Sequence, residues 1–296
     1  MRQILFLSGK GGTGKTSLAG AFAVLLNRKA LADCDVDAAN LHLLLEATPV
    51  EQGLYEGSKE AAIDADLCIR CGKCVDICRF YAITESFRVD PLLCEGCGAC
   101  ESVCPTGAIT LRPRVSGQWL VAETQVGPLV TAELLPGEEA SGKHVTEVKR
   151  RALAVAEKRG LRKLVIDGSP GIGCPVIASA SGVDLAILVT EPSRSGLHDL
   201  TRILEVVRHF RIEAGIVINK HDLSPVLTRT IEQFAEANGV PLLGKIPYDP
   251  LVPEAMVDGR SVVDDTESPA GIAMREISLR VLSAWRNSAG TKGIKT

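Results

Sequence analysis

Residues 8–16 of the chain read Ser8-Gly9-Lys10-Gly11-Gly12-Thr13-Gly14-Lys15-Thr16, and this stretch determines the architecture expected around it. Aliphatic residues at 3–7 predict a buried strand before the loop, and helix-forming residues from Ser17 on predict a buried helix after it. The stretch therefore matches the phosphate-loop pattern G-x-x-x-x-G-K-[ST] in the strand–loop–helix context that this pattern requires.

Each part of such a loop has a chemical task. Glycines let the backbone N–H groups curl around phosphates, and the helix that follows points its positive end at the anion. We expect Lys15 to reach the β and γ oxygens of a nucleotide and the Thr16 hydroxyl to bind Mg²⁺. The predicted nucleotide-binding residues of the loop are Gly9, Lys10, Gly11, Gly12, Thr13, Gly14, Lys15, Thr16 and Ser17.

Aliphatic strands and helices alternate through much of the remaining chain. Residues 30–35 predict a second strand, and residues 113–137 predict short strands or hairpins. Continuous aliphatic strands between helices predict an α/β fold with a doubly wound, mostly parallel sheet. The tail after Asn287 is expected to be disordered. From residue 142 on, the expected strands are 163–168, 184–190, 214–220 and 241–247, and the expected helices are about 143–159, 174–181, 196–209, 225–238 and 270–286.

The composition is that of a globular protein and excludes a disordered chain, a collagen and a coiled coil. Apolar residues make up 46% of the 296 residues, and the net charge is −3 with only 4% aromatic residues. These values argue against a nucleic-acid-binding surface. No signal peptide or membrane span is recognisable, so we expect a cytoplasmic protein without stable membrane association, in which thiols stay reduced.

Eight of the ten cysteines form two runs of C-x₂-C-x₂-C-x₃-C, offset by 26 residues. This spacing is typical of bacterial two-cluster ferredoxins, in which the fourth cysteine of each run binds the other 4Fe–4S cluster. We therefore predict an inserted α+β ferredoxin-like domain at 61–112, between the two parts of a phosphate-loop domain at 1–60 and 113–296. One cluster is assigned to Cys68, Cys71, Cys74 and Cys104, and the other to Cys94, Cys97, Cys100 and Cys78.

Zinc is the main alternative for the cysteines, although zinc sites commonly use two C-x₂₋₄-C pairs and do not need this doubled pattern. The first run ends in Cys78-Arg79, whereas the second ends in Cys104-Pro105. Because proline shapes the turn but supplies no ligand, we expect both clusters to form, with altered exposure or potential at the second.

The stretch K-G-G-T-G-K-T resembles the deviant Walker A loop of the MinD/ParA/Mrp superfamily, which includes the nitrogenase iron protein. The resemblance implies an ATP-dependent dimer, with itself or with a paralogue, in which Lys10 reaches the phosphates of the facing subunit. It also favours ATP over GTP, although Asn219-Lys220-His221-Asp222 fits the NKxD pattern that reads guanine.

Other positions match the same superfamily. The resemblance implies that Asp35, with Asn40 after it, belongs to switch I and orients the attacking water and the metal. It implies that Asp167 is the Walker B acid near Mg²⁺ and that residues 168–173 form switch II. Lys10, Lys15, Asp35 and Asp167 are thus the expected catalytic residues, and Asn219, Pro247, Tyr248 and Asp249 are expected around the adenine.

Two cysteines lie outside the runs. Cys34 is expected to be a buried strand residue. Cys174 directly follows Ser169-Pro170-Gly171-Ile172-Gly173 of the expected switch II, and it is expected either to be a plain buried thiol or to hold a bridging cluster or transient metal.

Three functions fit these features. In the first, MgATP drives a dimer switch that gates electron transfer through two 4Fe–4S clusters to a redox or metalloprotein partner. In the second, the protein is an assembly scaffold or carrier for iron–sulfur or other metal cofactors, as Mrp-like relatives are. In the third, it is a positioning or regulatory ATPase like MinD or ParA, with structural or redox-sensing clusters.

Overall fold

The computed structural model of the chain describes residues 1–287, which divide into two compact units. The first, called the sheet unit here, comprises Met1–Gln52, Leu120–Ala132 and the chain from Ala140 on. The second, called the cysteine unit, comprises Gly53–Trp119 and Glu133–Glu139. Both segments of the cysteine unit are thus interruptions within the sequence of the sheet unit.

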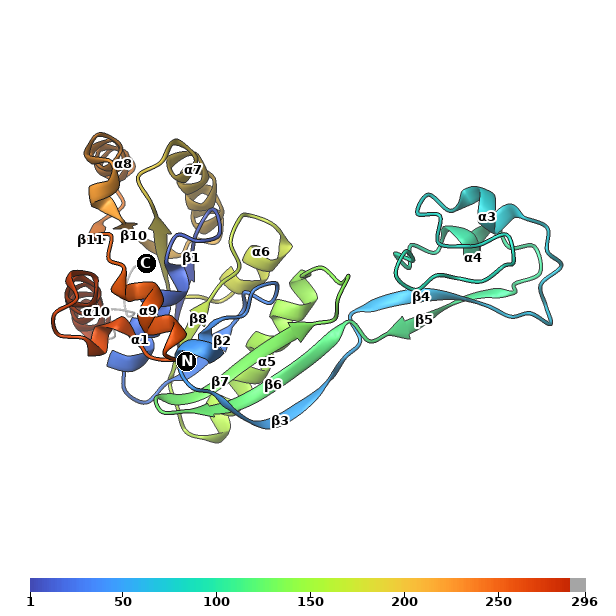
Figure 1. The fold of residues 1–296 in the computed structure, drawn as a ribbon, viewed down its shortest axis with the longest axis horizontal. Coiled ribbons are helices and arrows are strands. Elements are labelled where there is room, and N and C mark those ends of the chain that lie inside the picture. The colour runs from blue at the N-terminus through green and yellow to red at the C-terminus, as the bar shows by residue number, and fades with distance from the viewer. Residues whose placement is uncertain (288–296) are drawn as a thin grey trace, which may run out of the picture. The chain divides into compact units, whose positions relative to one another are not determined.

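Within the described residues, a nine-stranded sheet has the order β11-β10-β9-β1-β8-β2-β7-β6-β3 (Figure 1). All pairs from β11 to β7 are parallel, whereas two residues join β6 to β7 and make them a hairpin. The predicted α/β fold with a large, mostly parallel sheet is confirmed. The strands are β1 (Arg2–Leu7), β2 (Ala30–Asp33), β3 (Thr48–Tyr55), β6 (Gly117–Thr124), β7 (Gly127–Leu134), β8 (Lys163–Asp167), β9 (Leu185–Thr190), β10 (Glu213–Asn219) and β11 (Leu242–Ile246).

Helices cover the parallel part of the sheet on both faces (Figure 1). Ile4 and Phe6 of β1 belong to a buried cluster with Phe22 of α1 and Ile277 of α10. Because side chains alternate along a strand, the residues between them point to the opposite face, which α5, α6 and α7 cover. The helices are α1 (Lys15–Leu25), α2 (Leu41–Leu44), α5 (Gly142–Lys158), α6 (Cys174–Ala180), α7 (Arg194–His209), α8 (Pro225–Ala237), α9 (Leu251–Val257) and α10 (Pro269–Asn287).

From residue 142 on, each expected strand and helix is present within two residues of its expected bounds. β3 was not expected from its sequence, because most of its side chains are exposed and it lacks an aliphatic run. The predicted disordered tail after Asn287 lies outside the described residues. No helix within residues 1–287 combines the length and apolar character needed to cross a membrane.

The cysteine unit contains a two-stranded antiparallel sheet of β4 (Ser58–Ile63) and β5 (Ile109–Arg114). Two short helices, α3 (Lys73–Ile77) and α4 (Ala99–Val103), follow the C-x₂-C loops of the two cysteine runs. Few aliphatic residues are buried in this unit, and its buried cluster is Ala61, Cys74, Ala82, Ile83, Cys94, Cys100 and Ile109.

The two cysteine runs repeat in backbone as well as in sequence. The residue before each helix is a left-handed glycine, Gly72 with φ 79° and Gly98 with φ 78°. The residue after each helix is the fourth cysteine of its run, extended at φ −72° in Cys78 and −74° in Cys104. Glycine fits the left-handed position because it has no Cβ. The internal repeat inferred from the sequence is therefore a structural repeat.

Candidate functional site

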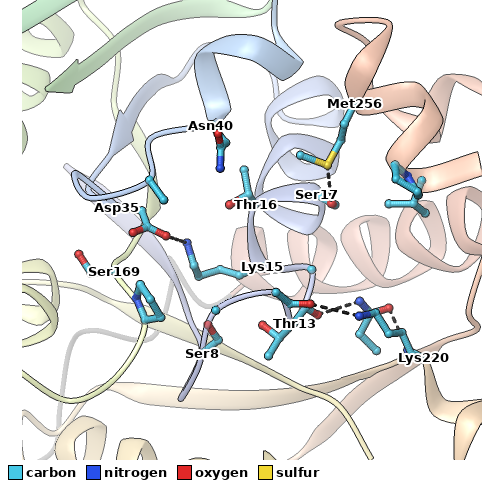
Figure 2. A pocket seen from close by; sticks show the side chains of 18 of the residues that line it. Ser8, Thr13, Lys15, Thr16, Ser17, Asp35, Asn40, Ser169, Lys220 and Met256 are labelled. Carbon is cyan, nitrogen blue, oxygen red and sulfur yellow. Dashed lines mark hydrogen bonds and ion pairs between the residues drawn. The ribbon is translucent and has the colours of Figure 1, made fainter. Parts of the chain in front are cut away.

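The phosphate-loop pattern forms one wall of a cavity of about 510 Å³ in the sheet unit (Figure 2). It lies where β1 ends and α1 begins, at the carboxyl ends of parallel strands, the usual place for ligands in such sheets. Most of the predicted nucleotide-binding residues line it: Gly11, Gly12, Thr13, Gly14, Lys15, Thr16, Ser17, Asn219, Pro247, Tyr248 and Asp249. Asp35 and Asn40 line it as well, whereas Gly9, Lys10 and Asp167 are not in the lining.

Two glycines make the tight curve of the loop possible. Gly12 and Gly14 have left-handed φ angles of 78° and 87°. A Cβ on Gly14 would lie 2.2 Å from Nδ2 of Asn219, which donates a hydrogen bond of 2.8 Å to the Thr13 carbonyl. Asn219 at the end of β10 thus holds the loop in place, and any side chain at position 14 would disrupt that contact.

Lys15 points into a group of buried carboxylates. Its Nζ lies 2.6 Å from Oδ1 of Asp167 and 3.2 Å from Oδ2 of Asp35 (Figure 2 shows the latter). Burial acts to lower the pKa of Lys15, but Asp167 and Asp35 outweigh it and raise that pKa. Thr16 Oγ1 donates to Oδ2 of Asp167 at 2.6 Å, so the carboxylate expected to be the Walker B acid contacts both loop side chains.

Asp33 is a further acid of this group, to which the sequence motifs assign no role. Its carboxylate is fully buried and accepts hydrogen bonds from the backbone N–H of Asp35 at 3.2 Å and of Leu41 at 3.0 Å. Burial, with the neighbouring Asp167, raises the pKa of Asp33 to about 7. Asp33 therefore anchors the segment from Asp35 to Leu41, where switch I is expected. Its place two residues before Asp35, at the last residue of the buried strand β2, was the available signal.

Lys10 lies apart from the cavity and is held by its own chain. Its Nζ forms an ion pair of 2.6 Å with Glu191 and hydrogen bonds to Ser195 Oγ at 3.1 Å. Lys220 also contacts Glu191, at 3.5 Å, and donates to the Gly12 carbonyl at 3.2 Å. Burial acts to raise the pKa of Glu191, but Lys10 and Lys220 lower it overall. Glu191, which follows β9, was not among the residues singled out from the sequence.

The cavity lining also includes Pro247, Tyr248 and Asp249, which are expected around the adenine. The Tyr248 side chain is 54% exposed at the rim. Asp249 lines the cavity, but its carboxylate accepts from Ser268 Oγ at 2.5 Å and from the backbone N–H groups of Leu251 and Ala270. These contacts tie the starts of α9 and α10 together, a structural task that sequence did not indicate. Met256, whose sulfur accepts from Ser17 Oγ at 3.4 Å, also lines the cavity (Figure 2).

The two cysteines outside the runs differ sharply in exposure. Cys34 is fully buried, as expected, although it lies one residue past the end of β2 and not in the strand. Burial raises the pKa of its thiol to about 12. Its carbonyl accepts a 2.6 Å hydrogen bond from Ser169 Oγ, which links the end of β2 to residues 168–173, where switch II is expected. Cys174 is exposed at the first residue of α6, so the interpretation as a plain buried thiol is wrong.

The cysteine unit contains two cavities, each lined by four cysteines. One is lined by Cys68, Cys71, Cys74 and Cys104. The other is lined by Cys78, Cys94, Cys97 and Cys100. These are the two sets expected from the ferredoxin spacing, including the exchange of the fourth cysteines between the runs. Within residues 1–287, no three His, Cys, Asp or Glu side chains lie close enough together to hold a single metal ion.

Backbone N–H groups are directed at the sulfurs of these cavities. Ala82 N donates to Cys78 Sγ at 3.3 Å, and Ala61 N donates to Cys94 Sγ at 3.4 Å. Burial raises the pKa of the Cys100 thiol. At Cys104 burial acts in the same direction, but hydrogen bonds from Thr106 and the following backbone lower the pKa. Such donors stabilise thiolates, the form in which cysteine binds iron.

Most of the chain is similar in sequence to a known family and to known proteins. The sequence model of the family described as "CobQ/CobB/MinD/ParA nucleotide binding domain" matches residues 4–262. The Uncharacterized protein MJ0578 of Methanocaldococcus jannaschii is 35% identical over 281 residues, covering 93% of this chain and 94% of that protein. The Iron-sulfur cluster carrier protein of Pyrococcus abyssi is 26% identical over 161 residues, covering 50% of this chain and 55% of that protein.

The fold also matches solved structures. The septum site-determining protein MinD of Pyrococcus horikoshii, solved in complex with Mg-ADP, superposes with a TM-score of 0.59 at 22% identity. The match covers 96% of this chain and 98% of that protein, and at this identity it shows a shared fold.

Proposed function

Because the chain belongs to the CobQ/CobB/MinD/ParA nucleotide binding domain family, we propose that it uses an ATP-dependent dimer switch to gate electron transfer. It is a nucleotide-binding ATPase of that family. The proposed electron path runs through two 4Fe–4S clusters to a redox or metalloprotein partner. One observation carries the proposal: a phosphate-loop cavity and two four-cysteine cavities occur in a single chain.

The nucleotide chemistry follows from the charges around the loop. Lys15 is already held as a cation by Asp167 and Asp35, and phosphate oxygens would provide it with a further anionic partner. Thr16 Oγ1 and the Asp167 carboxylate lie 2.6 Å apart, so one Mg²⁺ has both oxygens available. Mg²⁺ when bound would neutralise charge on the phosphate oxygens. We assign Asp35 to orient the water that attacks the γ phosphorus while the bond to the β–γ bridging oxygen breaks.

Dimerisation is part of the proposal because of Lys10. In the single chain its ammonium is held by Glu191 and Ser195, outside the cavity. To reach the phosphates of a facing subunit, Lys10 has to leave Glu191. ATP in the partner provides the competing anion, so dimer formation and nucleotide state are coupled through this one ion pair.

The cysteine unit fits two clusters. Each cavity offers four thiols and backbone N–H donors, which is the donor set of a 4Fe–4S site. A cube of iron and sulfide is larger than one ion, so its ligands stand further apart than those of a zinc site. Two such clusters, when bound, would accept and release single electrons. We propose that the ferredoxin-like domain at 61–112 binds them.

In this proposal, the nucleotide site and the clusters are coupled through the covalent chain that joins the sheet unit to the cysteine unit. The chain passes from the sheet unit into the cysteine unit at Gln52–Gly53, shortly after switch I with Asp35. β3, which spans this boundary, follows directly after the segment that Asp33 anchors through Leu41. A nucleotide-dependent movement of switch I is therefore transmitted along the chain to the cysteine unit.

Anaerobic purification with iron and sulfide analysis tests the proposal. We expect eight irons and eight sulfides per chain, the electron paramagnetic resonance signal of reduced 4Fe–4S clusters, and Mg²⁺-dependent ATP hydrolysis. Zinc in place of iron would contradict the cluster assignment. Eight irons without any ATP hydrolysis, alone or with added partner fractions, would contradict the ATP-driven switch.

A role as a cluster carrier is the second candidate. It is favoured by the resemblance to the Pyrococcus abyssi iron-sulfur cluster carrier protein and by the exposure of Cys174 next to switch II. A carrier needs a labile site that gives up its cluster. In that case Cys174→Ser would abolish ATP-dependent cluster transfer to an apo-ferredoxin, whereas the eight irons of the cysteine unit would remain.

A further inference from the structure

The two cysteine cavities have nearly the same backbone but opposite charges at their mouths. Position by position in the repeat, Arg70 and Lys73 stand where the second run has Gly96 and Ala99. Both basic residues line the cavity of Cys68, and both are exposed. The lining of the other cavity includes the exposed Glu95, which stands at the repeat position of Ile69.

Within residues 1–287, Arg70, Lys73 and Glu95 form no ion pair. Their fields therefore extend into solvent over about 10 Å at 0.1 M ionic strength. A field of this kind steers a charged partner toward the mouth that attracts it.

The opening of the Cys68 cavity, which Arg70 and Lys73 make basic, also exposes residues on the expected path of an electron. Cys71 is exposed, and the neighbouring Ile69 side chain is 64% exposed in the same lining. An apolar contact ringed by charges is the arrangement of a small, transient protein interface. Ile69 would be its apolar centre, and Arg70 and Lys73 its charged rim.

We propose that the loop of residues 68–74 is the electron port of the protein, and that it docks an acidic electron-transfer protein. The inference rests on the proposed function, since it needs a cluster behind Cys71. One electron leaves a reduced cluster for the oxidised centre of the partner, or enters by the reverse step. Arg70 and Lys73 act in docking only, and the acidic mouth at Glu95 repels the same partner.

Two haem proteins of opposite charge test the port. Dithionite-reduced protein, freed of excess reductant, is mixed in a stopped-flow instrument with acidic ferric cytochrome b5 or basic ferric cytochrome c. Each electron from a cluster converts one ferric haem to ferrous haem. Lys73→Glu is the test variant, and Glu at the first turn of α3 is favourable for the helix.

Arg112→Glu is the matched control, because it changes the net charge by the same amount. Arg112 lies on β5 next to Leu111, which lines the second cavity, so alternation directs Arg112 to the other face. At low ionic strength we expect Lys73→Glu to slow reduction of cytochrome b5 at least about threefold and Arg112→Glu to change it less than about 1.5-fold. About 0.5 M salt should remove the difference.

Several results would overturn the port. Equal slowing of cytochrome b5 reduction by both variants would mean that only overall charge matters. Equal slowing of cytochrome b5 and cytochrome c reduction by Lys73→Glu would mean that the charge at this mouth does not select the partner. Iron content and resonance spectra are measured on every variant. If the protein contains eight irons but its variants show no dependence on the charge of the acceptor, only the port is refuted. If it contains no iron, the proposed function on which the port rests is refuted as well.

Discussion

The sheet unit and the cysteine unit hold their sites in different ways. The phosphate loop follows β1, whose residues Ile4–Leu7 are completely buried between two layers of helices. The cysteine cavities rest on a buried cluster of seven residues, three of which are themselves cysteines of the runs. A nucleotide site on a large core is formed before its ligand arrives. A site whose ligands are also its core depends on the bound group for its stability.

Removal of iron should give the largest difference in response between the two units. After anaerobic chelation we expect protease cleavage within residues 64–107 to become about 100-fold faster, because the cysteine unit loses the groups that hold it together. ATP affinity should change less than about twofold, since the sheet unit keeps its own core. Limited proteolysis with mass spectrometry and a binding titration measure both effects. Equal protection with and without iron would contradict the contrast between the units.

Lys15→Ala should damage only the sheet unit's site. The variant removes the ammonium that Asp167 and Asp35 position, so we expect ATP affinity to fall at least about 100-fold, or about 2.7 kcal/mol. Iron content should stay at eight per chain. Lys10→Ala is the control: it should keep affinity within a few-fold but lose hydrolysis. Unchanged ATP binding by Lys15→Ala would show that the nucleotide site is misassigned.

Cys78→Ser distinguishes the two four-cysteine cavities of the cysteine unit. Cys78 lines the cavity of Cys94, Cys97 and Cys100, so only that cluster should be affected. We expect about four of eight irons to be lost, with one resonance signal retained. Cys174→Ser, at an exposed position outside both cavities, should lose none. Elemental analysis that found no iron missing from Cys78→Ser would contradict the exchange of ligands between the runs.

The smallest expected effect concerns Lys29 in the sheet unit. Burial, with Lys163 nearby, lowers the pKa of Lys29 to about 8, and its ammonium donates to the Val126 carbonyl. The folded state thus binds fewer protons than the unfolded state between about pH 8 and 10.5, so this group makes stability rise with pH across that range. Lys29→Met should raise the free energy of unfolding by about 1 kcal/mol at pH 7.

The advantage of Lys29→Met should shrink as pH approaches 10. Denaturant unfolding of both proteins at matched pH values, followed by circular dichroism, gives the difference directly, and contributions of the clusters cancel in it. A difference that stays constant from pH 7 to pH 10 would show that Lys29 does not titrate in the folded protein.

Local patterns predicted the features that depend on neighbouring residues. The phosphate loop, the alternation after residue 142 and the grouping of cysteines around two cavities follow from spacing, because each is set by a few consecutive dihedral angles and side chains. β3 was missed for the same reason: its exposed residues 48–55 have no periodic signal.

Features that depend on distant residues could not be predicted. Lys10 turns to Glu191 because β9 lies beside β1, and this pairing brings together residues 181 positions apart in sequence. Asp249 was expected near the adenine, yet its carboxylate is bound by Ser268 and Ala270 at the start of α10. Such contacts arise only when the sheet and its helices have assembled.

An anaerobic redox titration with and without MgATP, followed by electron paramagnetic resonance, tests the coupling of the two units most directly. If the nucleotide state is transmitted from switch I to the cysteine unit, saturating MgATP should shift the potential of at least one cluster by about 60 mV, which corresponds to about 1.4 kcal/mol for one electron. Lys15→Ala should show no shift. Unchanged potentials in protein that demonstrably binds ATP would contradict the gated electron transfer proposed here.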